Sequence, residues 1–478
     1  MEFFGRKQEI GDLMALWGKR SGSLVTCRGR RRIGKSTLIE RFAALSEARF
    51  IRIEGVRPRF GYDDAQERQV FGAQLAEQTN DSGALPVNWL EAFRRLNDAI
   101  TDNCRTVVLL DEVSWLAAYE PMFADFFKIA WDGSLSKHDR LIVVICGSVS
   151  TWIKEEFVDN GAFYGRRSLD LVIPELPLNE CVKFWGAAVS RIDLREIADV
   201  LSVTGGVPRY LREIDPWLSA GENIKRLAFR PKSVLREDFD EMFSDVITRQ
   251  PTLAGRIIRT LVNGSLSVSE IAGELGLGKG GKISSALEQL SEAGLIAAEA
   301  GRNPETGALV RERCYRLKDN YSRFYLKYIE PVRPIIDSGA YRFVSLDGLD
   351  GWESLMGLQF ENLIVNNYAS LIPHLHLGNA LIESAAPYRR KSSAAQEPGV
   401  QIDFLLQTRH NNYVIEIKRQ REIGRDVIDE VRAHLAKIRK SRGRSNRPVL
   451  VYEGHLAPIV ETDGYFDSLV SFRALLGL

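Results

Sequence analysis

The chain has 478 residues, of which 45% are hydrophobic and 27% are charged, and its formal net charge is +1. This composition is that of a globular protein too long for one hydrophobic core, so roughly three or four domains are expected. No run of residues approaches the roughly 20 apolar residues of a membrane span, and the opening MEFFGRKQEI has no apolar signal core. Five scattered cysteines without a CxxC pair argue against a disulfide framework and a zinc site. We therefore expect a cytoplasmic protein without membrane contact.

Residues 24–37 read LVTCRGRRRIGKST and contain the complete pattern G-x-x-x-x-G-K-[ST] between an apolar strand and a helical stretch. The two glycines let the backbone aim successive N–H groups at phosphate oxygens, and the start of the helix adds partial positive charge. An ordinary glycine turn is the alternative, but the flanking elements and the Lys-Ser pair disfavour it. Lys35 is expected to reach the β- and γ-phosphates, and the Ser36 hydroxyl to bind Mg²⁺. The predicted nucleotide contacts in this loop are Gly29, Arg30, Arg31, Arg32, Ile33, Gly34, Lys35, Ser36 and Thr37.

A second apolar strand is expected at residues 106–112 and ends in Asp111 and Glu112. A buried parallel strand presents residues at its carboxyl end, where ligands of α/β proteins bind. Asp111 would hold Mg²⁺ through water, and Glu112 would polarise the attacking water. A third strand at 141–146 is followed by Ser148, which would either sense the γ-phosphate or cap the next helix.

Arg166 lies in the turn that reads Phe163-Tyr-Gly-Arg-Arg167. An arginine offered to the γ-phosphate of a neighbouring subunit would neutralise charge in the transition state. Two arginines in a turn are also typical of a solvated surface. The sequence leaves both interpretations open.

The order of these motifs resembles the archaeal-type ATPase family, a branch of the AAA+ and STAND group of P-loop NTPases. The resemblance covers roughly the first half of the chain. It rests on Phe4-Gly5-Arg6 with Glu9, the phosphate loop, Leu110-Asp111-Glu112, Gly147-Ser148, Tyr164-Gly165-Arg166 and the run TGGVPRYL from Thr204. The resemblance implies an ATP-hydrolysing core at residues 1–170 and a helical lid at residues 171–245.

The same resemblance implies roles for individual residues. Phe4, Gly5 and Arg6 are expected near the adenine, and Arg166 is the candidate finger in a homo-oligomer. Pro208 is expected to open the lid beside the nucleotide. The chain departs from standard AAA+ enzymes at Ser148, where an asparagine is usual, and it shows no clear lid arginine beyond Arg209. STAND-type members often act as nucleotide-dependent switches.

Three helices and a β-hairpin are predicted within residues 246–330, in the order of a winged helix-turn-helix. Ser267-Val-Ser-Glu270 is a capping box that begins the second helix. The exposed residues of the third helix are hardly basic, so DNA binding and a purely structural role are equal alternatives. The basic residues that flank it are Lys279, Arg302, Arg311 and Arg313.

The C-terminal part, residues 345–478, carries a second set of polar residues. An apolar helix expected at 352–368 contains Glu361, and two strands, 401–406 and 413–418, flank a polar loop. If these strands form a hairpin, positions whose numbers sum to 819 face each other, so Asp403 lies opposite Glu416. Lys418 then projects from the same face as Glu416. We expect Ile402, Phe404, Ile415 and Ile417 on the opposite, apolar face.

This spacing resembles the PD-(D/E)XK nuclease superfamily, although Ile402 stands where the proline would be. The resemblance maps the family's acidic and lysine positions to Glu361, Asp403, Glu416 and Lys418. Asp403 and Glu416 would bind Mg²⁺ or Mn²⁺, and Lys418 would orient water and stabilise charge on the phosphate. A cross-strand ion pair on a solvated face is the alternative.

A basic segment beside this predicted site favours a polyanionic substrate. Residues 418–447 contain eleven Lys and Arg against four Asp and Glu, with clusters at 439–440 and 442–444. We expect an α/β P-loop NTPase core with a lid, a winged helix and a restriction-endonuclease-like domain, using ATP and Mg²⁺ and acting on DNA. The alternative is a STAND-like signalling or transcription-linked ATPase whose C-terminal domain binds DNA or protein without cutting.

Overall fold

The computed structural model describes residues 3–79, 84–101, 103–148, 150–246, 251–278, 280–310, 313–390, 399–438 and 443–478. The chain forms two compact units. The first contains residues 3–174 and a short segment that begins at Ser244, and the second contains residues 175–243 and 251–478. Within the described residues, no helix combines the length and the apolar character needed to cross a membrane.

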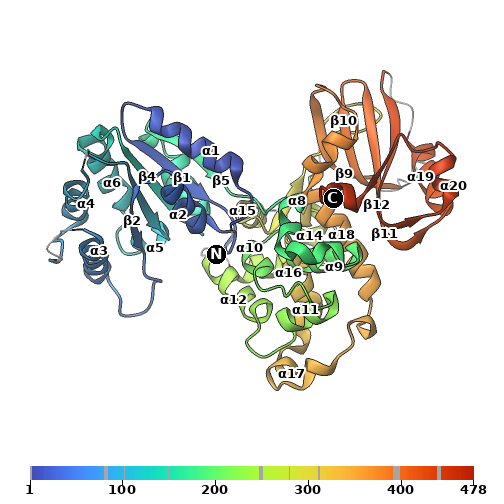
Figure 1. Cartoon of the computed structure of the whole chain (residues 1–478), viewed down its shortest axis with the longest axis horizontal. Helices are drawn as coiled ribbons and strands as arrows, with labels where there is room; N and C mark the ends of the chain where they lie inside the picture. Colours follow the sequence, from blue (N-terminus) through green and yellow to red (C-terminus); the bar gives the residue numbers. More distant parts are fainter. Residues whose placement is uncertain are drawn as a thin grey trace. The chain divides into compact units, whose positions relative to one another are not determined.

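The first unit is built on a five-stranded parallel sheet with the strand order β2-β3-β4-β1-β5. Figure 1 shows these strands in the blue and teal part of the chain. The strands are β1 (Ser23–Arg28), β2 (Arg49–Glu54), β3 (Thr106–Asp111), β4 (Leu141–Gly147) and β5 (Arg167–Val172). The three strands predicted from the sequence are therefore confirmed as β1, β3 and β4, and the structure adds β2 and β5.

Helices pack around this sheet, and a parallel sheet needs them to bury its apolar strands. β3 and β4 are buried along their whole length, as expected for central strands. An aromatic cluster with Trp89, Phe93 and Phe123 packs edge to face in the same core. The helices are α1 (Lys7–Ala15), α2 (Lys35–Leu45), α3 (Asp64–Gln78), α4 (Trp89–Asp98), α5 (Val113–Leu116), α6 (Phe123–Gly133) and α7 (Ser150–Ile153).

The second unit begins with helices and a small antiparallel sheet of strand order β6-β8-β7. The capping box predicted at Ser267 is present at the start of α14. The three helices and the hairpin predicted within 246–330 are found at these positions, whereas Lys279 and residues 311–312 lie outside the described residues. The elements are α8 (Leu178–Cys181), α9 (Leu194–Thr204), α10 (Pro208–Leu211), α11 (Ala220–Ala228), α12 (Val234–Val246), α13 (Pro251–Thr260), β6 (Leu266–Ser267), α14 (Val268–Glu274), α15 (Gly281–Glu292), β7 (Ile296–Glu299) and β8 (Cys314–Leu317).

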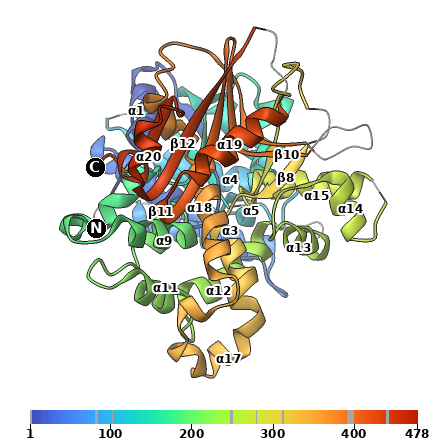
Figure 2. The same ribbon diagram turned by 90° about the vertical axis from the view of Figure 1, so that its right-hand side faces the viewer.

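The rest of the second unit is a five-stranded mixed sheet with the order β13-β12-β11-β10-β9. Helices α19 and α20 lie against its strands (Figure 2). The strands are β9 (Ile382–Arg390), β10 (Val400–Thr408), β11 (Asn411–Ile423), β12 (Ser445–Leu456) and β13 (Ser468–Ser471). The helices are α16 (Asn320–Phe324), α17 (Arg333–Asp337), α18 (Trp352–Asn366), α19 (Asp426–Lys437), α20 (Pro458–Thr462) and α21 (Phe472–Leu475).

The predicted hairpin register is confirmed in the antiparallel pair β10–β11. Phe404 faces Ile415 and Gln407 faces Asn412, and both pairs of numbers sum to 819. The strands run further than predicted, so the polar loop shrinks to the turn between Thr408 and Asn411. The expectation for Ile402 is wrong. An irregularity between Ile402 and Leu405 changes the strand's alternation, and Ile402 packs in a different apolar cluster from Phe404.

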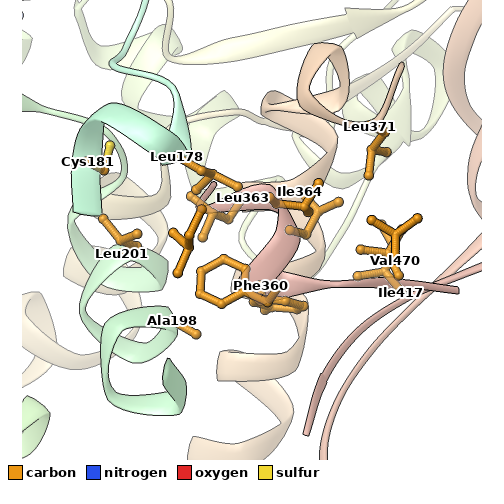
Figure 3. Packing of buried hydrophobic residues seen from close by; sticks show 14 of the residues in the cluster. Leu178, Cys181, Ala198, Leu201, Phe360, Leu363, Ile364, Leu371, Ile417 and Val470 are labelled. Atoms are coloured by element: carbon orange, nitrogen blue, oxygen red, sulfur yellow. The ribbon is translucent and has the colours of Figure 1, made fainter. Parts of the chain in front are cut away.

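A single hydrophobic core joins the helices that follow Glu175 to the C-terminal sheet. Figure 3 shows side chains from α8 and α9, among them Leu178 and Leu201, packed against Phe360 and Leu363 of α18. Asn320 strengthens this junction from its buried position, because its amide donates to Ser202 O (2.9 Å) on α9 and Gln359 O (3.0 Å) on α18. The segment predicted as the nucleotide lid therefore folds as one body with the C-terminal sheet.

One local expectation from the sequence is also wrong. The alternation of His374 and His376 favours a strand, but residues 368–374 form a 3₁₀ helix. His376 has φ +49°, outside the extended region that a strand requires. Leu371 and Leu375 supply the buried positions here, so the apolar spacing belongs to a helical turn.

Candidate functional sites

The phosphate loop connects β1 to α2 in the first unit, as the sequence predicts. Gly29 (φ +148°) passes so close to Ile173 that a Cβ would lie 2.6 Å from its carbonyl oxygen. Gly34 (φ +87°) forms the left-handed N-cap of α2. A side chain at either position would strain the turn, so both glycines are needed for the path of the loop. The predicted contacts Arg30, Arg31, Arg32, Ile33, Ser36 and Thr37 all lie in this loop or in the first turn of α2.

Lys35 is buried within this loop. Its Nζ donates to the carbonyl oxygens of Gly29 (3.0 Å) and Arg30 (3.2 Å). The ammonium is therefore held against the loop's own backbone, in the place where an anion drawn in by the loop and the start of α2 would be neutralised.

Arg6 braces the same loop from the N-terminal segment. Its guanidinium donates to Ile33 O (3.4 Å) and Pro174 O (2.6 Å), and it forms an ion pair with Glu9 (3.2 Å). The backbone at Gly5 and Arg6 is left-handed (φ +74° and +61°), which turns the chain into α1. The structure thus brings Arg6 to the phosphate loop.

Asp111 and Glu112 lie together at the carboxyl end of β3, as predicted. Asp111 is 3% exposed, and its Oδ2 accepts from Arg52 Nη2 at 2.8 Å. Glu112 is left-handed (φ +47°), and its Oε2 accepts from both the backbone N (3.1 Å) and the Oγ (2.9 Å) of Ser148. The Ser148 side chain is therefore directed at Glu112, an arrangement that fixes the orientation of the carboxylate expected to polarise water.

Arg52 is a residue of this site that the sequence analysis does not identify. Besides Asp111, it forms ion pairs with Glu40 (3.0 Å) and Glu54 (3.0 Å). The alternation of polar and apolar residues in β2, which reads RFIRIE, indicates a strand. It does not indicate which acids pair with Arg52. A cation held by Asp111 would compete with Arg52 for the same carboxylate.

Arg166 precedes β5 and forms a bidentate ion pair with Asp132 of α6, at 2.6 and 2.9 Å. Its hydrogen bonds lower the pKa of the Asp132 carboxyl. The guanidinium also donates to Ala162 O (2.8 Å). A role in trans would require Arg166 to leave these partners. Pro208, another predicted contact, is buried at the first position of α10 in the second unit.

The second unit brings the four C-terminal residues to one cavity of about 770 Å³. Glu361 comes from α18, Asp403 from β10, and Glu416 and Lys418 from β11. Asp403 Oδ2 accepts from the backbone N of Ile417 at 2.9 Å, so the carboxylate lies against β11.

Lys418 is held between two carboxylates. Its Nζ lies 2.7 Å from Glu416 Oε1 and 2.8 Å from Glu430 Oε2. Burial alone would lower the pKa of Lys418, but the charges and hydrogen bonds of Glu416 and Glu430 raise it. Lys418 is therefore a fixed positive charge at neutral pH and not a proton acceptor.

The carboxylates of this cavity disfavour one another's ionisation. Burial and the charge of Glu416 raise the pKa of Glu361 to about 7, against the pull of Arg323. Burial and the charges of Glu416 and Glu361 also raise the pKa of Asp403. One buried and two partly buried acids repel one another here, and a divalent cation would relieve that repulsion.

The arrangement is not that of a ready-made metal site. Across the part of the chain that the structure describes, no three His, Cys, Asp or Glu side chains are arranged to hold a metal ion. Glu416 is engaged by Lys418, and Asp403 by a backbone N–H. The residues fit a cation in their chemistry, since Asp403 and Glu416 offer oxygen ligands once Lys418 moves away from Glu416.

Glu430 and His434 are site residues that the sequence analysis does not identify. They lie four residues apart on α19, so they share one face of that helix, and both line the cavity. His434 Nδ1 lies 3.7 Å from Glu416 Oε2. The i, i+4 spacing of an acid and a histidine after the predicted Lys418 is a signal that could have indicated them.

The raised pKa values predict how stability depends on pH. Because Glu361 has a higher pKa in the folded than in the unfolded chain, its contribution is present below about pH 4.5 and is lost as pH rises through about 7. We expect the metal-free protein to melt at lower temperature at pH 8 than at pH 5, with Glu361 contributing on the order of 2 kcal/mol. Thermal unfolding followed by circular dichroism should show a weaker pH dependence in Glu361→Gln, and an unchanged dependence would contradict the burial of this acid.

A comparison of the sequence with known protein families supports the nucleotide-binding assignment of the first unit. Residues 3–214 match a family model described as an ATPase domain predominantly from Archaea. With the phosphate loop and the parallel sheet, this match shows an ATPase domain in the N-terminal part of the chain. The match ends before the sheet that carries Asp403 and Glu416.

Individual proteins are similar at low identity. The uncharacterized protein MJECL04 of Methanocaldococcus jannaschii is 22% identical over 365 residues, which are 76% of each chain. The Walker-type ATPase paby2304 of Pyrococcus abyssi is 18% identical, with a TM-score of 0.49, over 68% of this chain and 96% of its own. The ORC2 protein of Aeropyrum pernix, in its ADPNP-ADP complexes, is 14% identical, with a TM-score of 0.41, over 71% of this chain and 95% of its own.

Proposed function

We propose that this protein is an ATP-binding and ATP-hydrolysing switch that controls a metal-dependent nuclease site in its C-terminal sheet, with DNA as the substrate. The observation that carries the nuclease proposal is the convergence of Glu361, Asp403, Glu416 and Lys418 on one cavity. A lone cross-strand ion pair would not explain why a third acid, Glu361, reaches the same cavity from α18.

In this proposal each residue has a separate task. Lys418, which is fixed as a cation, stabilises the negative charge that develops on the phosphate. Glu361 has a pKa of about 7, which suits a group that exchanges a proton near neutral pH. Asp403 and Glu416 would hold Mg²⁺ or Mn²⁺, which when bound supplies Lewis-acid activation of the attacking water.

The ATP site has a parallel division of tasks. Lys35 and the backbone of the phosphate loop hold the phosphates, Ser36 and Asp111 would hold Mg²⁺, and Glu112 polarises water. Self-association would be required if Arg166 acts on a neighbouring subunit. The basic clusters at 439–440 and 442–444, expected to grip DNA, fall largely on residues 439–442, which lie outside the described residues.

A network of charges supports communication between the lid segment and the nuclease site. Arg419, the neighbour of Lys418, has a buried side chain paired with Asp199 of α9 and with Glu353 of α18 (3.0 Å). Arg195 of α9 pairs with Glu353 (3.4 Å) and with Glu453 of β12 (3.3 Å). A movement of α9 would therefore displace Arg419 and, with it, the part of β11 that carries Lys418.

This network gives a testable prediction. Asp199→Asn should reduce the ratio of cleavage rates with and without ATP by roughly five- to tenfold, a loss of coupling of about 1–1.4 kcal/mol, because the change removes a charged partner of the buried Arg419 and loosens α9 from β11. The ratio is measured within each variant, so any general loss of activity cancels. Asp463→Asn, at an exposed position of the same unit, is the control. A wild-type ratio in Asp199→Asn would show that the signal does not pass through Arg419.

The experiment that tests the proposed function is incubation of the purified protein with supercoiled plasmid and with circular single-stranded DNA. Reactions contain Mg²⁺ or Mn²⁺, with and without ATP. Cleavage that requires the metal and changes with ATP is the expected result. The alternative is a STAND-like switch whose C-terminal domain binds without cutting. The ion pair between Lys418 and Glu416 favours this alternative, because it occupies a proposed metal ligand. DNA-stimulated ATP hydrolysis without cleavage would support it.

A further inference from the structure

A second cavity of about 460 Å³ adjoins the candidate nuclease site within the second unit. Glu361 and Gln401 line both cavities, so the two spaces meet at the acid expected to exchange a proton. The residues around the second cavity come from α13 and the segment that follows it, from α14, β7, β8 and α16, and from α18, β9 and β10. Its size falls in the range of roughly 300–1,000 Å³ that is typical of small-ligand pockets.

The walls of this second cavity combine apolar and amide groups. Leu266, Leu358 and Tyr388 contribute apolar surface, and the side chains of Asn263 and Gln401 are exposed at its edge. Within the described residues, neither amide makes a hydrogen bond. A side-chain amide carries both donors and an acceptor, so it can pair with the edge of a nucleobase whose face lies on an apolar wall.

Four arginines (Arg259, Arg316, Arg323 and Arg389) line the same cavity beside three acids (Glu274, Glu299 and Glu361). The side chains of two of these arginines are about half exposed. Arg259 (50%) pairs with Glu330, and Arg389 (43%) lies 4.0 Å from Glu270. Exposed ion pairs of this kind contribute at most about 1 kcal/mol, so a phosphate can replace the carboxylate at little cost. Phosphate-binding groups thus flank a space suited to a base.

From this combination we propose that the second cavity binds the unpaired nucleoside next to the phosphodiester positioned at Glu361, an inference that rests on the proposed nuclease function. A base in a duplex cannot enter such a cavity without leaving its stack. The substrate class is therefore nucleic acid that is single-stranded or unpaired at the site of cleavage. Stacking of one base in such a pocket is worth about 1–3 kcal/mol, or roughly 5- to 150-fold in affinity.

The test uses the full-length Glu416→Ala protein, so that no substrate is consumed. Fluorescence anisotropy measures its affinity for a thymidine oligonucleotide and for an abasic oligonucleotide of equal length, which carries the same phosphates without bases. We expect the thymidine oligonucleotide to bind at least fivefold more tightly. Leu266→Trp, which fills the cavity, should abolish that preference, and Leu266→Met, which keeps the volume, should retain it.

A second variant keeps the inference testable if the Leu266→Trp protein does not fold. Asn263 is exposed, so Asn263→Ala leaves the core unchanged and should reduce the preference roughly two- to tenfold. If both variants bind the oligonucleotides with the wild-type preference, the cavity does not hold a base and the inference fails while the nuclease proposal stands. If the protein binds neither oligonucleotide, the inference fails, and cleavage of the plasmid decides the nuclease proposal separately.

Discussion

Replacing Lys35 by alanine should lower the affinity for ATP on the order of 100-fold and abolish measurable ATP hydrolysis. The loss is large because the buried ammonium, now held by Gly29 O and Arg30 O, is the charge that faces the β- and γ-phosphates in a loop of this kind. Titration of a fluorescent ATP analogue measures affinity, and phosphate release measures turnover.

Arg41→Ala is the matched control for Lys35→Ala, because Arg41 is an exposed cation on the same helix. It should leave both quantities near the wild-type value. If Lys35→Ala bound and hydrolysed ATP as well as Arg41→Ala, the nucleotide site would have to be placed elsewhere.

Replacing Glu416 by alanine should abolish metal-dependent cleavage of DNA, a loss on the order of 1,000-fold, while ATP hydrolysis continues. Glu416 is 4% exposed, contacts Lys418 and raises the pKa values of Glu361 and Asp403. Its removal would therefore take away a proposed metal ligand and lower the pKa values of Glu361 and Asp403. Lys418→Ala should be equally inactive, because a fixed cation is lost.

The control for Glu416→Ala is Glu422→Ala, an exposed acid further along β11. Plasmid nicking is measured in parallel with phosphate release, so that loss of cleavage is separated from loss of folding. Cleavage that survived in Glu416→Ala would place the nuclease activity outside this cavity or in a contaminant.

The sequence predicts those parts of the fold that local pattern determines. The complete phosphate-loop motif indicates its own strand and helix, and the alternation of two short strands predicts the pairing of Phe404 with Ile415. β9 could not be predicted in this way, because Pro387 and small residues interrupt its apolar alternation. β12 contains Pro448 and several polar residues, which hide its pattern.

Contacts between distant elements could not be predicted in the same way. The apolar spacing of α9 shows that one face is buried, but not that Leu201 packs near Phe360 of α18. The ion pairs could not be predicted either. Arg52 contacts Asp111, and Lys418 contacts Glu430, only because the folded chain brings different elements together. The irregularity near Ile402 depends on the pairing of β10 with its neighbours, which a single strand does not reveal.

The core shared by α9 and α18 limits how this chain could be recombined with its relatives. The family match runs to residue 214, yet the compact first unit stops at Pro174. A crossover at the end of the family match would separate Leu201 from Phe360 and leave two mismatched apolar surfaces. The helices that follow Glu175 therefore pack with the C-terminal sheet although the family match reaches into them, and a hybrid chain that keeps this core intact must carry both together.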